Sequence, residues 1–169
     1  MPPGTALASA ARRKAWTPAL FDASGVAVNL GTGATAHGEY FQVGDSVFYE
    51  FVVVFGTGVT FTNAGTFTVS LPVAPAVSPT GRFPTAMGVI PAGHGRMNDA
   101  DAESGVGEFA NWVLDWGVSL ASSRLTGWID RRATTDGTSS LLQSASPITI
   151  AVNDMINGIG HYPVSLTAL

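Results

Sequence analysis

Short runs of alternating apolar and polar residues, each ended by glycine, asparagine or aspartate, constrain the fold of this chain more than any other feature. The clearest run, residues 46–55, places β-branched and aromatic side chains at every second position from Val47 to Phe55. This period of two is that of a β-strand. Because Phe48 and Val52 at the alternate positions are also apolar, we expect both faces of this strand to be covered.

Further strand-length runs recur along the chain with glycine-containing breaks between them. We expect strands at 26–30, 39–43, 59–62, 65–71, 85–90, 125–130, 141–144, 147–152 and 155–166, the last interrupted at Gly158 and Gly160, and a polar loop at 93–107. Residues 112–120 fit both helix and strand spacing, and we favour a strand because the rest of the chain is β. The pattern predicts an all-β fold: a single antiparallel β-sandwich, jelly-roll-like, of roughly eight to ten strands.

Charged side chains are scarce and unevenly distributed. Of 169 residues only 12% are charged, and the net charge is −4, whereas soluble domains carry about 25% charged residues. The 46% hydrophobic content excludes a disordered chain, and the negative charge argues against nucleic-acid binding. Residues 51–81 contain no charged side chain, which favours contact with copies of the same chain because few charges need desolvation.

The distribution of apolar and basic residues also bears on membrane insertion and on domain organisation. No run is long and apolar enough to predict a transmembrane helix, and the basic residues follow the small apolar stretch instead of preceding it, so we predict no signal peptide. We divide the chain into an N-terminal arm, 1–15, and a β-sandwich, 16–169, with an elaborated middle region at about 73–107. The arm holds three of the eight basic residues, Arg12, Arg13 and Lys14. It is either a frayed terminus or a segment that docks on a neighbouring subunit.

No motif predicts a catalytic or metal site. The Gly31–Ala36 segment resembles a dinucleotide fingerprint, but a strand follows it where a helix is required. Oxygen-bearing residues in Asp99–Glu103 lack the glycine and glutamate of a calcium loop, which leaves a solvated acidic loop or an irregular calcium site. With no cysteine and three scattered histidines (His37, His94 and His161), the sequence predicts no metal ligand set, and we expect no cofactor.

Two sets of side chains are weak candidates for a functional site, one catalytic and one ligand-binding. A glycosidase-type pair of carboxylates needs two of Glu39, Glu50, Glu108, Asp115 and Asp130, but nothing selects two of them, so we expect no enzyme. Trp112, Trp116 and Trp128 are candidate ligand-facing aromatics, because tryptophan offers a large contact area at low entropic cost. The alternative, which we favour, is that they belong to the core.

Several segments together resemble a β-sandwich module of tailed-phage virion proteins, found in minor tail, receptor-tip and capsid-decoration-type proteins of actinobacterial phages. The segments that carry the resemblance are Trp16-Thr17-Pro18, Gly31-Thr32-Gly33, Gly38–Val47, Phe55-Gly56-Thr57-Gly58, Gly65–Val73, Pro147–Ile156 and Gly160-His161-Tyr162. They are strand and turn pieces, strongest over 16–73, and the region 75–107 departs from the pattern. The resemblance implies a jelly-roll-like sandwich, usually trimeric, with no catalytic residues.

Two functions follow from this resemblance as expectations. The first is a non-enzymatic capsid-decoration or minor capsid subunit, exposed on the virion after assembly in the host cytoplasm, with major capsid or tail proteins as partners. The second is a minor tail or receptor-binding tip protein that recognises a host cell-surface glycan. A third hypothesis, a glycan-degrading enzyme on the same scaffold, is weaker. Because the module begins soon after residue 15, we expect attachment through the N-terminal arm, which favours the first function.

Overall fold

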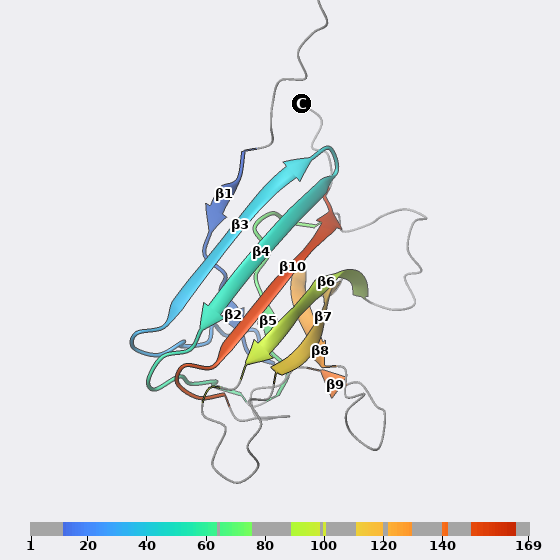
Figure 1. Cartoon of the computed structure of the whole chain (residues 1–169). Helices are drawn as coiled ribbons and strands as arrows, with labels where there is room; N and C mark the ends of the chain where they lie inside the picture. The colour runs from blue at the N-terminus through green and yellow to red at the C-terminus, as the bar shows by residue number, and fades with distance from the viewer. Residues whose placement is uncertain are drawn as a thin grey trace, which may run out of the picture.

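All described residues of the chain belong to one antiparallel β-sheet and its connections. The computed structural model describes residues 12–63, 65–75, 89–98, 100, 111–119, 122–129, 140–141 and 150–164. The strands are β1 (Lys14–Trp16), β2 (Leu20–Phe21), β3 (Thr35–Val43), β4 (Ser46–Val54), β5 (Thr68–Val69), β6 (Val89–Asn98), β7 (Asn111–Ser119), β8 (Arg124–Ile129), β9 (Ser140–Leu141) and β10 (Met155–Pro163) (Figure 1). The predicted all-β class is confirmed. No helix that could cross a membrane occurs in these ranges.

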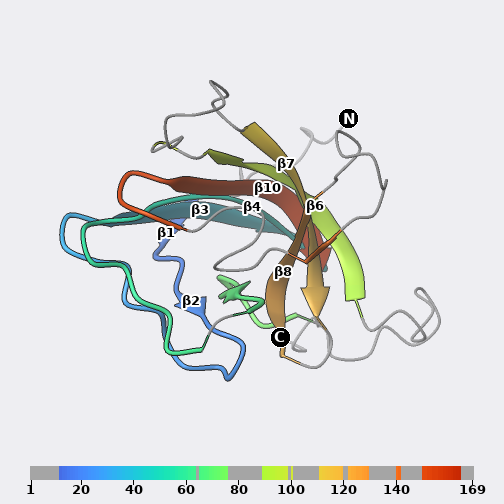
Figure 2. The same ribbon diagram turned by 90° about the horizontal axis from the view of Figure 1, so that it is seen from below.

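The strand order shows how the sheet closes on itself. Neighbours follow the order β1-β3-β4-β10-β6-β7-β8-β5-β2, with β9 paired to β8. Although β1 and β2 are consecutive in the chain, they lie at opposite ends of this order. In Figure 2 the sheet curls so that β2 lies below β3 and β4. The fold is compatible with the predicted sandwich, although hydrogen bonds run through one curled sheet.

The core fills the inside of the curl. Along β4 the odd-numbered residues are buried, as their alternation predicts, and they meet buried side chains from six other strands. The buried hydrophobic residues are Leu20, Val47, Tyr49, Phe51, Val53, Phe55, Phe67, Val69, Ile90, Ala92, Met97, Leu114, Trp116, Val118, Leu125, Ile150, Ile156, Tyr162 and Val164. Burial raises the pKa of both core tyrosines, so their phenols stay neutral donors. Tyr162 Oη donates to the carbonyl of Val73 at 2.8 Å, which ties the segment after β5 to β10.

Glycines continue the strands where the sequence predicted interruptions. β10 runs unbroken through Gly158 and Gly160, so the predicted interruption is wrong. β6 includes Gly93 and Gly95, so the predicted polar loop at 93–107 is wrong over residues 93–98. The reason is space on the inner face: a Cβ on Gly158 would lie 2.7 Å from Trp116 Nε1, and one on Gly95 would lie 2.6 Å from the same atom. The indole of Trp116 occupies the room that these two residues leave.

Four predicted strands are reduced or absent. Residues 26–30 and 59–62 form only isolated bridges, such as Asn29 with Thr60. The chain turns at Gly31, Gly33 and Gly58, all at positive φ, so no ladder can extend from these bridges. The described part of 147–152 is not a strand, because the Asp154 carboxylate accepts the main-chain N–H of Ala151 at 2.7 Å and closes a turn. Of 65–71, only Thr68–Val69 is strand.

The close contact of β6 and β10 predicts a strong effect of Gly160→Ala. A Cβ at this position would lie 1.8 Å from the carbonyl oxygen of Ala92, so main chain must move. We expect the free energy of unfolding to fall by about 1–3 kcal/mol or more, measured by urea denaturation. Val26→Ala, at an exposed position in the loop after β2, is the control. Equal small effects of both changes would contradict the tight packing of this strand pair.

A buried carboxylate organises the loops that follow β2. The Asp22 carboxylate accepts a hydrogen bond from the Ser24 hydroxyl at 2.7 Å. It also accepts main-chain N–H groups of Ser24 at 2.9 Å, Val26 at 3.0 Å and Asn63 at 3.1 Å. These bonds, that from the Ser24 hydroxyl first, hold the pKa of Asp22 below its ordinary value of 3.8. The ionised carboxylate therefore joins two loops that are far apart in the sequence.

This network predicts how the stability difference between wild type and Asp22→Asn depends on pH. Because the folded-state pKa is lowered, the ionised carboxylate stabilises the protein above pH 3.8, and this contribution disappears as pH falls through the lower folded-state value. We expect Asp22→Asn to melt below wild type at neutral pH and the difference to shrink below about pH 4. Melting curves at a series of pH values check this, and a pH-independent difference would contradict it.

Candidate interaction surface on the outer face of the sheet

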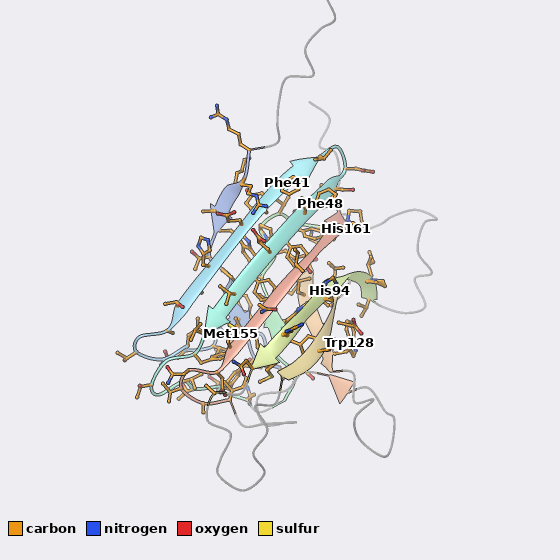
Figure 3. The ribbon with its side chains drawn as sticks, viewed as in Figure 1. Phe41, Phe48, His94, Trp128, Met155 and His161 are labelled. Carbon is orange, nitrogen blue, oxygen red and sulfur yellow. The ribbon has the colours of Figure 1, made fainter. Side chains whose placement is uncertain are left out.

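Alternate residues of β3, β4, β10, β6 and β7 point away from the core and form what we call the outer face. On β4 these are the residues between the buried ones, Phe48 among them. Register aligns Phe41 with Phe48 and Phe48 with His161, so that these three form one row across β3, β4 and β10. Figure 3 shows the three side chains in this order across the sheet. The next row aligns Glu39, Glu50 and Ile159.

The first row is an aromatic stack. The rings of Phe41 and Phe48 lie 5.0 Å apart at an interplanar angle of 7°, and the rings of Phe48 and His161 lie 5.5 Å apart at 28°. Phe48 remains 36% exposed. Stacked rings on a sheet give a rigid apolar surface that loses little entropy on binding.

The second row places two carboxylates opposite each other. Glu39 and Glu50 are register partners on β3 and β4, an arrangement that is unfavourable for like charges. Arg13 compensates it: Nη1 donates to Glu39 Oε2 at 3.0 Å and also to Glu50 Oε1. The hydrogen bond to Glu39 and the charge of Glu50 raise the pKa of Arg13. The Arg13 side chain is nevertheless 60% exposed.

A shallow hollow of about 200 Å³ is lined by residues of both rows and by Arg13. The lining residues include Phe41 and Phe48 of the first row and Glu39, Glu50 and Ile159 of the second. A second, more open hollow of about 540 Å³ adjoins it over His37, Val52 and Asn157. Both lie on the outer face, so the surface is concave where its polar and apolar rows meet.

Exposed large hydrophobic side chains concentrate on this face. Among the described residues they are Val26, Val43, Phe48, Val113 and Ile159, and all except Val26 belong to strands of the outer face. We predicted that both faces of the 46–55 strand are covered. Within the described part of a single chain this is wrong. The apolar residues expected to be covered, Phe48 among them, lie on a surface that solvent reaches.

Of the three candidate ligand-facing tryptophans, Trp116 lies on the inner side of the sheet. Trp116 is buried, and its Nε1 donates to the carbonyl of Asn157 at 3.0 Å. The favoured interpretation, that it belongs to the core, is therefore confirmed, and it is not a ligand-facing residue. Trp128 is half-buried on β8 (Figure 3) and packs over Gly117. The side chain of Trp112 lies outside the described residues.

The basic residues of the predicted arm begin the sheet. Lys14 and Ala15, assigned to the arm, are the first two residues of β1 and pair with β3. Arg12 is exposed, Arg13 bridges the two glutamates, and Lys14 Nζ lies 5.9 Å from the Tyr40 ring centroid. Arg13 and Lys14 therefore contact residues of β3 in the isolated chain.

The remaining candidate groups are dispersed. His37 Nε2 lies 3.9 Å from Glu39 Oε1, His94 lies on β6 opposite Asp115 of β7, and His161 belongs to the aromatic row. Within the described ranges no three His, Cys, Asp or Glu residues gather to hold a metal. Glu108, Asp130 and the acidic residues of 99–103 lie outside these ranges.

Sequence reasoning missed the outer face, although its signals were present. Phe48 and Glu50 stand at the second set of alternate positions of the same strand, and Phe41 and Glu39 stand two residues apart in the strand before it. Only the register of the β3–β4 hairpin aligns these residues in two rows.

Comparison of the chain with protein-family models, with curated proteins and with solved structures finds no match.

Proposed function

We propose that this protein is a non-enzymatic structural subunit of a tailed-phage virion, a surface-exposed capsid-decoration or minor capsid protein that assembles as a homo-oligomer, with a trimer expected. The observation that carries the proposal is the outer face, where Phe48, Ile159 and Val113 remain exposed. On β4 apolar residues occupy both sets of alternate positions, which is typical of a sheet that is covered on both faces. Copies of the same chain would cover the outer face.

Two properties support assembly over catalysis. The carboxylates that lie closest to the apolar row are neutralised by Arg13, and residues 51–81 carry no charge. A charge-poor surface with exposed aliphatic and aromatic side chains is typical of the centre of an interface between subunits. The resemblance in the sequence to a virion module is consistent with this role.

The experiment has two parts. Sedimentation velocity of the purified chain should give an oligomer, and quantitative mass spectrometry of purified phage particles should give hundreds of copies per virion. A monomer at all concentrations would contradict the homo-oligomer. A protein absent from particles would contradict the virion role, and a few dozen copies or fewer would move it to the tail.

The second candidate is a receptor-binding tip protein for a host glycan. The aromatic row of Phe41, Phe48 and His161 favours it, because sugar rings stack on aromatic side chains and their hydroxyls donate to carboxylates such as Glu39. Glycan arrays probed with the purified oligomer test it. Binding that Phe48→Ala removes would support this function, and no binding to host cells or glycans would count against it.

A further inference from the structure

The segment Arg12–Trp16 binds to β3 and β4 through three separate contacts. Arg13 bridges Glu39 and Glu50, Lys14 lies over Tyr40, and Trp16 lies against Gly38 with its ring edge-to-face to Phe51 at a centroid distance of 6.2 Å. A Cβ on Gly38 would lie 2.3 Å from Trp16 Nε1. The absence of a side chain at Gly38 thus makes room for the indole. These contacts define a complementary binding site for the segment.

This segment is joined to the rest of the fold by a short connection. β1 has three residues and lies at the edge of the sheet, whereas β2 begins at Leu20 at the other end of the strand order. The chain is anchored again at Ala19, whose amide donates to Ser70 Oγ at 3.0 Å and whose carbonyl accepts the Ser70 amide at 2.8 Å. Thr17 and Pro18 therefore form the whole connection between β1 and this anchor.

Charge complementarity selects the same segment as the occupant of the Glu39–Glu50 site. Opposed carboxylates on neighbouring strands need a cation, and Arg12–Lys14 contains three of the eight basic residues of the chain. Arg13 matches the site best because one guanidinium presents several N–H donors to two carboxylates.

We propose that Arg12–Trp16 is exchanged between copies, so that Arg13 of one subunit binds the Glu39–Glu50 pair of the next. This inference rests on the proposed homo-oligomer and names the contact that links its subunits. Exchange conserves every contact of the segment, because each copy supplies one segment and receives one, so it adds little energetic cost. It also holds the neighbouring copy against the edge of β3, beside the exposed Val43.

Disulfide trapping separates exchange from pairing within one chain. Ala15 and Glu39 are register partners, and Cα atoms of antiparallel partners lie about 4.5–5.5 Å apart, within disulfide range. The chain has no cysteine, so Ala15→Cys/Glu39→Cys creates only this pair, and Arg13 keeps Glu50. After oxidation of the full-length oligomer we expect covalently linked oligomers on a non-reducing denaturing gel. The control Ala15→Cys/Thr57→Cys, with Thr57 exposed on another loop, should stay monomeric on the gel.

The outcomes distinguish this inference from the proposed function. An oligomer in sedimentation that yields only internally bridged monomers, or no disulfide, would overturn exchange and leave the virion role standing. A wild-type chain that sediments as a monomer would contradict the homo-oligomer itself.

A charge-reversal pair gives an independent test without cysteines. Arg13→Glu, and separately Glu39→Lys/Glu50→Lys, should each lose assembly because like charges then meet. When the two variants are mixed, the acidic segment of the first fits the basic site of the second, and the unchanged segment of the second fits the unchanged site of the first. In a ring of three copies this restores two of the three contacts, so exchange predicts mixed oligomers by native mass spectrometry. Pairing within one chain restores nothing on mixing, and the absence of mixed oligomers would overturn the proposal.

Discussion

Replacing Trp116 by alanine is expected to lower the free energy of unfolding by about 3–5 kcal/mol, a large fraction of the stability of a typical domain. The side chain is 1% exposed and lies edge-to-face against Phe51 at 5.4 Å. It also fills the space above Gly95 and Gly158. The variant therefore leaves a cavity and removes the hydrogen bond to the carbonyl of Asn157.

Urea denaturation at one fixed protein concentration measures this loss, since oligomerisation also affects apparent stability. Trp116→Phe keeps much of the volume and should cost less than Trp116→Ala. Trp128→Ala, at a half-buried position on β8, is a matched tryptophan control and should also cost less. If the two alanine variants lost equal stability, Trp116 would not be the central packing element of β6, β7 and β10.

The strands with continuous alternation were predictable from the sequence. The prediction of 46–55 differs from β4 by one residue, and the choice of strand over helix at 112–120 agrees with β7. Both have large apolar side chains at every second position, so local pattern and tertiary packing point to the same structure. β6 was predicted only at its start, because the glycines that follow, read as a loop, make room for Trp116 of another strand.

The outer face could not be predicted because it depends on pairing between strands. The sequence placed Phe48 on the second side of its strand but could not say what covers it. Neither the Phe41–Phe48–His161 row nor the opposed pair Glu39 and Glu50 exists until the register is known. Residue type alone does not distinguish buried from exposed aromatics, so the favoured assignment of Trp116 to the core is confirmed only by its burial.

Ile159→Glu is expected to dissociate the proposed oligomer while the fold persists. Ile159 is 49% exposed and is the register partner of Glu50 on β4, so the change replaces an apolar contact and adds a third carboxylate to the row of Glu39 and Glu50. Loss of a central interface side chain costs about 2 kcal/mol or more, which corresponds to a roughly thirtyfold or greater rise in the dissociation constant. Sedimentation velocity over a concentration series measures this rise.

Val26→Glu is the matched control because Val26 is 48% exposed and lies in the loop after β2, away from the outer face. It changes the net charge equally and should leave the oligomer intact. Melting curves of both variants should stay close to wild type under conditions where all three are monomeric, because neither position belongs to the core. If both variants dissociated alike, net charge would explain the effect. If neither variant dissociated, the outer face would not be the contact between copies. Its exposed aromatic row would then favour the glycan-binding alternative, for which Phe48→Ala is the decisive change.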